Sequence, residues 1–112
     1  MLSTELISLR ADSCAETDGN IGLFDELLDE IAQRELVNLL MPKCKGFAAV
    51  FCGSDADGYR YVIGSRNIDL RKNARAINGL ISGRGGGRPE MISGRASSSS
   101  EDILNALNTA KF

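Results

Sequence analysis

The stretch GFAAVFCGSDADGYRYVI, residues 46–63, predicts two β-strands joined by a turn. Residues 46–52 and 59–63 are rich in aromatic and β-branched side chains with small residues between them, which favours strands. Residues 53–58 are glycine, serine, aspartate and one alanine, a composition typical of a turn longer than two residues. Because apolar side chains alternate onto both faces of the first strand, we expect other elements to cover both faces of the sheet.

Apolar spacing and capping residues predict further elements on either side of this hairpin. Upstream, they predict a helix at residues 4–15, a short buried strand at 21–24, and a helix that Asp25 caps and that ends at Met41 before Pro42. Downstream, they predict a helix that Asp69 caps and that stops at Gly83, a short strand at 92–96, and a helix that Ser99 caps.

The apolar stripes of three of these helices would face the sheet. The stripes are Leu28, Ala32, Leu36, Leu39 and Leu40; Leu70, Ala74, Ile77, Leu80 and Ile81; and Ile103, Leu104, Leu107 and Ala110. Helices that bury one face against a few strands indicate an α/β fold, in which a small mixed β-sheet packs against helices. A length of 112 residues suits one such domain, which we expect to span residues 1–112.

The composition of the chain argues against a metal site and lowers the expectation of an enzyme. The chain contains no histidine, and its three cysteines, Cys14, Cys44 and Cys52, form no CxxC pair. Without histidine, acid–base chemistry would fall to carboxylates or lysine. Unpatterned thiols suit a reducing compartment, so we expect a cytoplasmic protein. No apolar run approaches the roughly 20 residues of a membrane span, so we expect no membrane partner.

Acidic and basic residues are segregated along the chain. Residues 1–42 carry nine acids against two arginines, a net charge of −7, whereas residues 43–95 carry ten bases against four acids, a net charge of +6. The remaining residues contribute −1, which gives the total of −2. A polyanion would therefore meet the second half of the chain.

The run Arg84-Gly-Gly-Gly-Arg88 predicts a loop that binds an anion. Backbone N–H groups at Gly85, Gly86 and Gly87 and the forked guanidinium groups of both arginines would form one electropositive cradle for phosphate oxygens. The run is neither a P-loop, because the GK[ST] ending is absent, nor a dinucleotide fingerprint, which requires a preceding strand. The alternative is structural, in that the glycines would let this segment cross close to another backbone.

Further basic residues flank this run in the predicted helix, in the loop before that helix and in the strand after the run. They are Arg66, Arg71, Lys72, Arg75 and Arg95. They would extend a shared basic surface, although a solvated helix face is the alternative for those on the helix. Tyr59 and Tyr61 could stack on bases, but their i, i+2 spacing favours packing on one face of the sheet.

Residues 83–91, GRGGGRPEM, resemble the GGKGGGRPDMAQAGG-type signature near the end of alanyl-tRNA synthetases. Further stretches are more similar still to the end of freestanding alanyl-tRNA editing proteins: FCGSD at 51–55, GYRYVIG at 58–64, DLR at 69–71 and AIN at 76–78. Together these resemblances cover residues 20–110.

The resemblance implies a DHH-associated domain, an α/β unit that in the synthetases binds the outer corner of the L-shaped tRNA. It implies no catalytic residues and no cofactor in this domain, which would be a fragment of a longer synthetase or editing protein. The partners would be tRNA, taken to be tRNA-Ala, and the catalytic domains of that parent. The residues expected to bind RNA are Arg66, Arg71, Lys72, Arg75, Arg84, Gly85, Gly86, Gly87, Arg88 and Arg95.

Departures from the signature leave other functions open. Ser93 stands where the family has glutamine, and Arg95 where it has a small residue, so the contacts of that half are not carried over. DHH-family phosphoesterases have GGGH at this place, and Arg88 replaces its histidine. One alternative is a domain that clamps a substrate phosphate for a phosphoesterase domain elsewhere. The other is an interaction module that forms a homodimer through the hairpin edge or the first helix.

Overall fold

Five strands form one mixed β-sheet in the order β1-β2-β3-β5-β4. The strands are β1 (Ile21–Phe24), β2 (Ala48–Ser54), β3 (Gly58–Gly64), β4 (Gly83–Arg88) and β5 (Met91–Ala96). β1 pairs with β2 in parallel, and every other neighbouring pair is antiparallel. The computed structural model describes residues 19–25 and 29–110, so the helix predicted at residues 4–15 lies outside the described residues.

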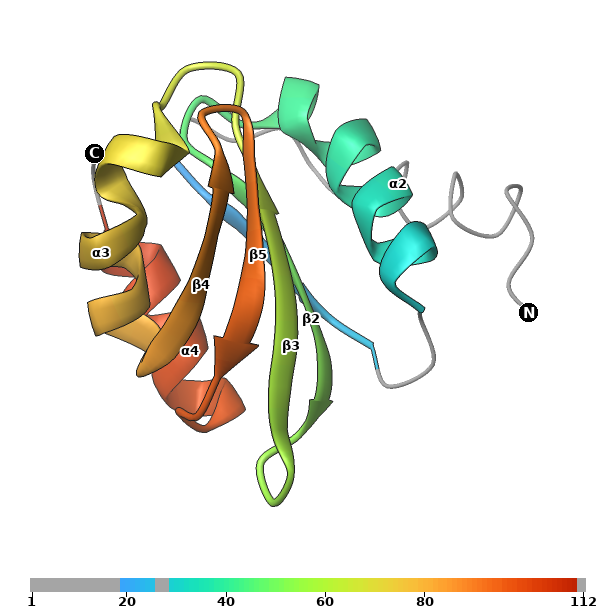
Figure 1. Cartoon of the computed structure of the whole chain (residues 1–112), viewed down its shortest axis with the longest axis vertical. Coiled ribbons are helices and arrows are strands. Elements are labelled where there is room, and N and C mark those ends of the chain that lie inside the picture. The colour runs from blue at the N-terminus through green and yellow to red at the C-terminus, as the bar shows by residue number, and fades with distance from the viewer. Residues whose placement is uncertain (1–18, 26–28, 111–112) are drawn as a thin grey trace.

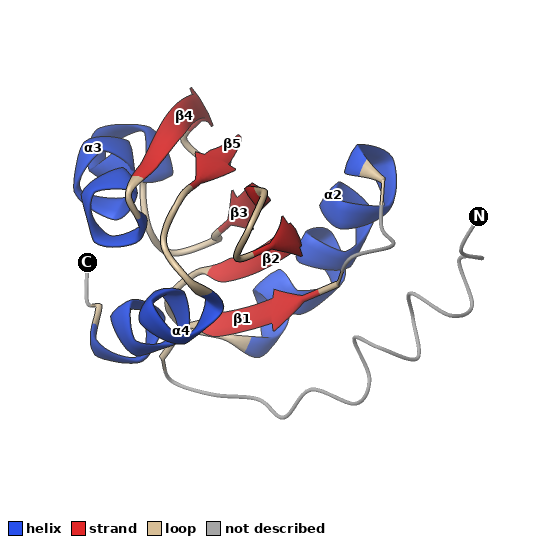
Figure 2. Ribbon diagram, turned by 90° about the horizontal axis from the view of Figure 1, so that it is seen from below, coloured by secondary structure: helices blue, strands red, loops and turns tan. Residues whose placement is uncertain are grey.

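Helices cover both faces of this sheet (Figure 1). α2 (Glu30–Leu40), followed by the short 3-10 turn η1 (Met41–Lys43), packs on one face against β2 and β3. Figure 2 shows α3 (Leu70–Ile81) and α4 (Ser100–Thr109) on the opposite face, with α3 beside β4 and α4 beside β1. The prediction of an α/β fold, with a small mixed sheet packed against helices, is confirmed.

Alternating side chains fill a separate core on each side of the sheet. In β3, Tyr59, Tyr61 and Ile63 pack toward α3 and α4, whereas Val62 packs toward α2. The core on the α2 side also contains Leu36, Val37, Leu40, Ala48 and Val50, and the other core contains Phe47, Phe51, Leu70, Ile77, Ile81, Ile92, Ile103 and Leu107. Both faces of the hairpin are therefore covered, as the alternation of its side chains predicts.

The predicted hairpin is confirmed; β2 has the predicted length but lies two residues nearer the turn, and β3 is one residue longer at each end than the sequence indicates. β2 and β3 pair along their whole length and leave a turn of residues 55–57. Gly53 (φ 142°) and Gly58 (φ 84°) adopt backbone conformations that side chains disfavour, which lets the strands continue into the turn. β2 and β3 are both interior strands of the sheet, so the alternative in which the hairpin edge pairs with a second subunit is wrong.

Capping signals in the sequence identify two helix starts and misplace a third. The side chains of Asp69 and Ser99 accept hydrogen bonds from the backbone N–H three residues ahead, as predicted. The prediction that Asp25 caps the preceding helix is wrong, because Asp29 caps α2. The backbone N–H of Asp25 instead donates to the carbonyl oxygen of Phe51, which continues the pairing of β1 with β2.

The helices are slightly shorter and less apolar than their predicted stripes. Leu39, Leu80 and Leu104 are 37%, 42% and 39% exposed, so these three leucines lie outside the cores. α3 ends at Ile81, and Ser82, in the left-handed conformation (φ 52°), caps it directly before Gly83, the residue at which the sequence predicts the helix to stop. α3 has 12 residues, and none of the helices within the described ranges has the length and apolar content needed to cross a bilayer.

Residues 83–88 form β4, so the prediction of a loop at this position is wrong. β4 is an edge strand that pairs with β5 from Gly83↔Ala96 to Arg88↔Met91. Glycine is a poor strand former on average, because it packs no side chain and loses much backbone freedom. Contacts of Gly85 with Asn78 and Tyr61 nevertheless hold this glycine-rich segment as a strand.

Asp55 in the hairpin turn links the turn to the start of α4. Its Oδ1 accepts hydrogen bonds from the hydroxyl of Tyr59 at 2.6 Å and from the backbone N–H of Ser100 at 2.8 Å. These hydrogen bonds, of which that from Tyr59 is the larger cause, hold the pKa of Asp55 below its ordinary value. Folding therefore favours the ionised form of this carboxyl group.

We predict that Asp55→Asn lowers the free energy of unfolding at pH 7 and that this loss shrinks at low pH. The stabilisation from the lowered pKa is present above the ordinary aspartate value of about 4 and is lost as pH falls through the folded value. Urea unfolding of both proteins at pH 7 and at acid pH measures the difference. Tyr59→Phe, which removes the main donor, should reduce the same pH dependence. An unchanged difference between the two proteins across this pH range would contradict the assignment.

Candidate nucleic-acid interface

A chain of hydrogen bonds fixes β4 against α3. The hydroxyl of Tyr61, a fully buried residue, donates to Oδ1 of Asn78 at 2.6 Å, and Nδ2 of Asn78 donates to the carbonyl oxygen of Gly85 at 3.1 Å. Burial raises the pKa of Tyr61, an effect that the bond to Asn78 partly offsets, so the hydroxyl stays protonated at neutral pH. A buried hydroxyl without a partner costs about 1–3 kcal/mol, so Tyr61 and Asn78 depend on each other.

Gly85 makes room for this tyrosine, and Gly94 makes room for the backbone of β4. Tyr61, Gly94 and Gly85 are neighbours in register across β3, β5 and β4. A Cβ at Gly85 would lie 2.5 Å from the Tyr61 hydroxyl oxygen and 2.2 Å from the carbonyl oxygen of Ser93. The tyrosine therefore reaches across to α3 because Gly85 carries no side chain. The structural alternative for the glycine run, close approach to another backbone, is confirmed at Gly85.

The other glycines of the run differ from each other. A Cβ at Gly87 would lie 2.7 Å from the carbonyl oxygen of Met91, whereas a Cβ at Gly86 would meet no atom within 4 Å. Gly86 is exposed, on the face of β4 that points away from α3 and α4. The fold thus accounts for Gly85 and Gly87 but gives no reason for glycine at position 86.

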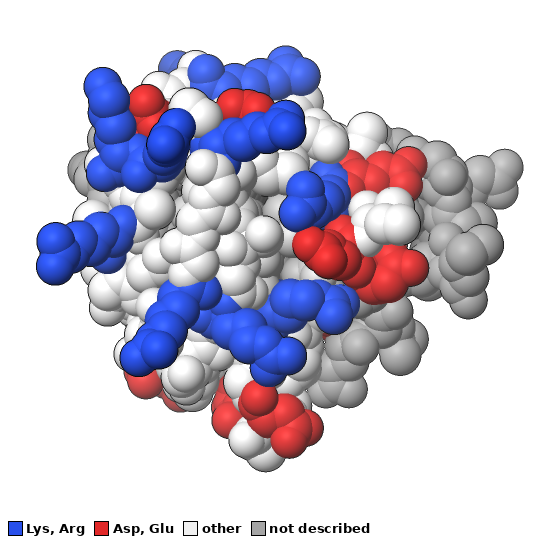
Figure 3. Space-filling model, in the orientation of Figure 1, with Lys and Arg blue, Asp and Glu red and all other residues white. Residues whose placement is uncertain are grey.

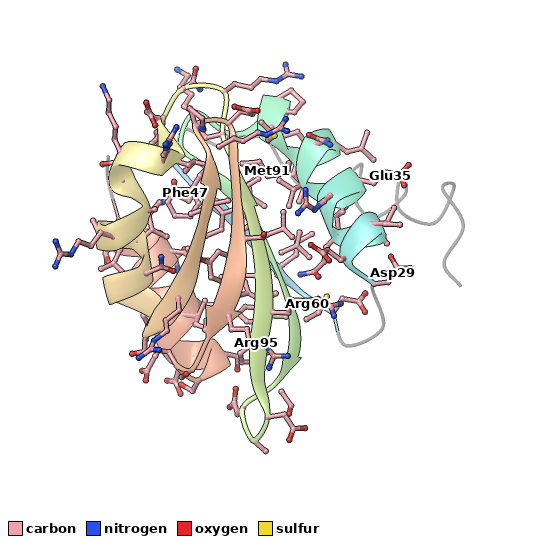
Figure 4. The ribbon with its side chains drawn as sticks, in the orientation of Figure 1. Asp29, Glu35, Phe47, Arg60, Met91 and Arg95 are labelled. Atoms are coloured by element: carbon pink, nitrogen blue, oxygen red, sulfur yellow. The ribbon has the colours of Figure 1, made fainter. Side chains whose placement is uncertain are left out.

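Three arginines form a row on the α2 side of the sheet, which we call the arginine row: Arg60, Arg95 and Arg84. They are paired in register across β3, β5 and β4, and all three are exposed. Figure 3 shows positive side chains gathered over this end of the strands, and Figure 4 labels Arg60 and Arg95 near each other there. Adjacent strands are about 5 Å apart, so the row concentrates positive charge.

Two members of the arginine row have no acidic partner within residues 19–25 and 29–110. Arg84 and Arg95 make no side-chain hydrogen bond or ion pair there. Arg60 is oriented by the buried Gln33, whose Oε1 accepts a hydrogen bond from its Nε at 2.9 Å. Like charges directly opposite each other destabilise a strand pair, so an anion lying over the row would relieve this repulsion.

A groove with a volume of about 430 Å³ lies between α2 and the strands β4 and β5, and we call it the α2–β4 groove. Arg34 and Asn38 line it from α2, and residues 86–88 and 90–93 line it from the sheet. Arg34 forms an ion pair with Glu30 at 3.1 Å, whereas Arg88 pairs with no acid in the described part of the chain.

A second groove, of about 690 Å³, lies on the other side of β4, and we call it the α3–β4 groove. Arg71 and Arg75 of α3 line it together with Arg84 of β4. No carboxylate is among its lining residues, which are Arg71, Ala74, Arg75, Asn78, Gly79, Ser82, Gly83, Arg84 and Gly85. The bond between Asn78 and Gly85 ties its two walls together.

The structure distributes the predicted basic residues over both sides of β4. Arg71, Arg75, Arg84 and Arg88 line the grooves, and Arg95 lies in the arginine row. Arg84 and Arg88 lie at opposite ends of an extended strand, about 13 Å apart by strand geometry, so the run is not a compact cradle.

Two residues predicted to bind RNA line neither groove, and two residues that were not predicted contribute to the basic surface. Arg66 and Lys72 are exposed but line neither groove. Arg60 and Asn78 contribute to the surface although the sequence does not single them out as site residues. Their roles come from strand register and from a contact between α3 and β4, which no local pattern indicates.

The remaining sequence candidates are buried. Tyr59 and Tyr61 are 6% and 0% exposed, so packing within the sheet is confirmed and base stacking by these rings is wrong. Cys44 and Cys52 are buried, and burial raises the pKa of the Cys44 thiol, which favours its uncharged form. In the part of the chain that the structure describes, no group of three or more cysteine, aspartate or glutamate residues could hold a metal ion.

We predict that Asn78→Ala lowers the free energy of unfolding by about 1–3 kcal/mol, because it leaves the Tyr61 hydroxyl buried without an acceptor. The same substitution in a Tyr61→Phe background should cost less, since no hydroxyl then lacks a partner. Urea unfolding of the wild type, both single variants and the double variant gives the coupling energy. A coupling energy near zero would show that the hydroxyl is satisfied elsewhere.

Gly85→Ala and Gly86→Ala form a matched pair of variants. Gly85→Ala should destabilise the fold by more than about 1 kcal/mol, because its Cβ overlaps Tyr61 and the backbone of β5. Gly86→Ala should change the free energy of unfolding by less than about 0.5 kcal/mol, since open space surrounds that position. Thermal unfolding of both variants makes the comparison. Equal losses would rule out the Tyr61 packing as the reason for glycine at position 85.

The fold is similar to that of a known domain. It superimposes on the crystal structure of the C-Ala domain from Aquifex aeolicus alanyl-tRNA synthetase with a TM-score of 0.63, covering 86% of this chain and 90% of that chain. The two sequences are 18% identical, so the likeness is one of fold. Neither a protein-family model nor a curated protein matches this sequence. The structural likeness is to a domain of the enzyme whose signature residues 83–91 resemble.

Proposed function

We propose that this chain is a tRNA-binding module of an alanyl-tRNA synthetase or an alanyl-tRNA editing protein. Two independent features support the proposal: the likeness in fold to the C-Ala domain of an alanyl-tRNA synthetase and the signature-like residues 83–91. The observation that carries it is the arginine row, because its charges lie side by side and Arg84 and Arg95 pair with no described acid.

The arginine row suits a phosphate chain. A guanidinium group presents a rigid fork of N–H donors that matches two phosphate oxygens at once. Neighbouring arginines repel each other in the free protein, and a polyanion laid across β3, β5 and β4 would turn this repulsion into attraction. Because the row is exposed, a large folded RNA can reach it without a change in the protein.

Contacts with phosphates and with RNA shape fit this surface better than base reading. Its tyrosines are buried, so no aromatic platform for bases is offered by Tyr59 or Tyr61. Acidic side chains lie at the margins, on α2, where Figure 4 labels Asp29 and Glu35, and at the hairpin turn that holds Asp55. These acids would repel an RNA that approaches in a different orientation.

The partners we propose are tRNA, with tRNA-Ala as the expected species, and the catalytic domains of a longer parent protein in the cytoplasm. The module would be of the DHH-associated type, would hold tRNA in place, and would contribute no catalytic residue or cofactor. Aminoacylation or editing would then take place elsewhere in the parent protein.

We predict that tRNA affinity falls steeply with salt. If about four basic side chains meet phosphates, the logarithm of the binding constant should fall against the logarithm of salt with a slope of about −3 to −4. Arg84→Glu and Arg95→Glu should each weaken binding about tenfold or more and flatten the slope by about 1. Fluorescence anisotropy of labelled tRNA-Ala at several salt concentrations measures both quantities.

Lys45→Glu is the matched control, because it changes the net charge equally but lies outside the arginine row and both grooves. Its affinity for tRNA should stay within about twofold of the wild type. A binding constant that is independent of salt, or an equal loss in all three variants, would contradict the proposal. Binding of a mononucleotide in the absence of tRNA binding would favour the phosphoesterase alternative.

A further inference from the structure

Gly79 lies in the last turn of α3, where the fold gives no reason for a glycine. It is exposed, and a Cβ built on it would meet no atom within 4 Å. Glycine destabilises a helix relative to alanine, because it gains backbone freedom in the unfolded chain. At Gly85, by contrast, a side chain would collide with Tyr61. Glycine at this position thus lowers helix stability and serves no contact among the described residues.

The space beside Gly79 belongs to the α3–β4 groove. Gly79 lines this groove between the arginines of α3, Arg71 and Arg75, and the strand that carries Arg84. A side chain at position 79 would therefore narrow the groove. Its volume, about 690 Å³, lies in the range of pockets that hold molecules the size of a nucleotide.

The side chains that line the α3–β4 groove make it positively charged, which favours an anionic ligand. Three arginines and no carboxylate line it, and none of the three pairs with an acid among the residues that the structure describes. The α2–β4 groove differs, because Glu90 is among its lining residues and Arg34 is already paired with Glu30. The α3–β4 groove is thus the more strongly cationic of the two.

We propose that the α3–β4 groove seats a second stretch of sugar–phosphate backbone of the bound RNA, which lies against the bare helix surface at Gly79. Arg71 and Arg75 hold its phosphates from α3, and residues 83–85 of β4 form the opposite wall of the groove. The RNA is then gripped on both sides of β4, with the arginine row on one side and this groove on the other. The inference rests on the proposed function and adds a second contact surface to it.

The test compares Gly79→Ala and Gly79→Gln with Ala76→Gly, an exposed position of α3 that does not line the groove. Gly79→Ala should raise the melting temperature by a few degrees and yet weaken binding of a tRNA-Ala transcript about threefold. The longer Gly79→Gln should weaken binding about tenfold or more. Ala76→Gly should lower the melting temperature and leave the affinity unchanged.

A Gly79→Ala variant that is more stable and yet binds tRNA more weakly has lost a contact with RNA, because a loss of folding would lower its stability as well. If the wild type binds tRNA and both Gly79 variants bind equally well, the groove is not a contact surface, and the proposed function stands on the arginine row alone. If the wild type fails to bind tRNA at low salt, the proposed function and this inference both fail. Weakened binding by Ala76→Gly to the same degree would also overturn the inference.

Discussion

The buried hydroxyl of Tyr61 is the constraint on which the basic surface depends. It needs an acceptor, and Asn78 of α3 provides one and in turn holds the carbonyl group of Gly85 in β4. The tyrosine can lie in this position because Gly85 carries no side chain in its path. A polar group inside the core thereby sets where the outermost strand of the sheet runs relative to the helix beside it.

The position of β4 decides where the positive charges lie. Because β4 pairs with β5 in this register, Arg84 comes to lie beside Arg95 and completes a row that begins at Arg60. The same strand forms one wall of each groove, so its position also decides how both grooves are shaped. The charge segregation along the sequence becomes a spatial one, with acids on α2 and at the hairpin turn and bases around β4 (Figure 3). An electropositive surface of this kind steers a polyanion toward one face of the molecule.

Patterns within a few residues of each other predict most helices and strands correctly, but they do not predict strand register or the contacts between distant elements. The caps at Asp69 and Ser99 could be identified because capping involves residues only three apart. The acids Asp25 and Asp29 precede the same apolar pattern, and only the extended pairing of β1 with β2 excludes Asp25 as the cap. Glycine is a poor strand former, so the glycine run predicts a loop. The contact with Tyr61 that holds this run as a strand comes from a distant strand, and composition carries no information about it. For the same reason the sequence did not reveal Arg60, whose place in the arginine row is set by register.

Backbone amide NMR of the chain during titration with tRNA-Ala tests the central claim most directly, because it locates the contact surface residue by residue. An RNA-binding surface around β4 predicts saturable shifts at residues 83–88 and 93–96 and along α3, which weaken as salt is added. Shifts confined to α4 or to the outer face of α2, or no saturable shifts at low salt, would contradict it.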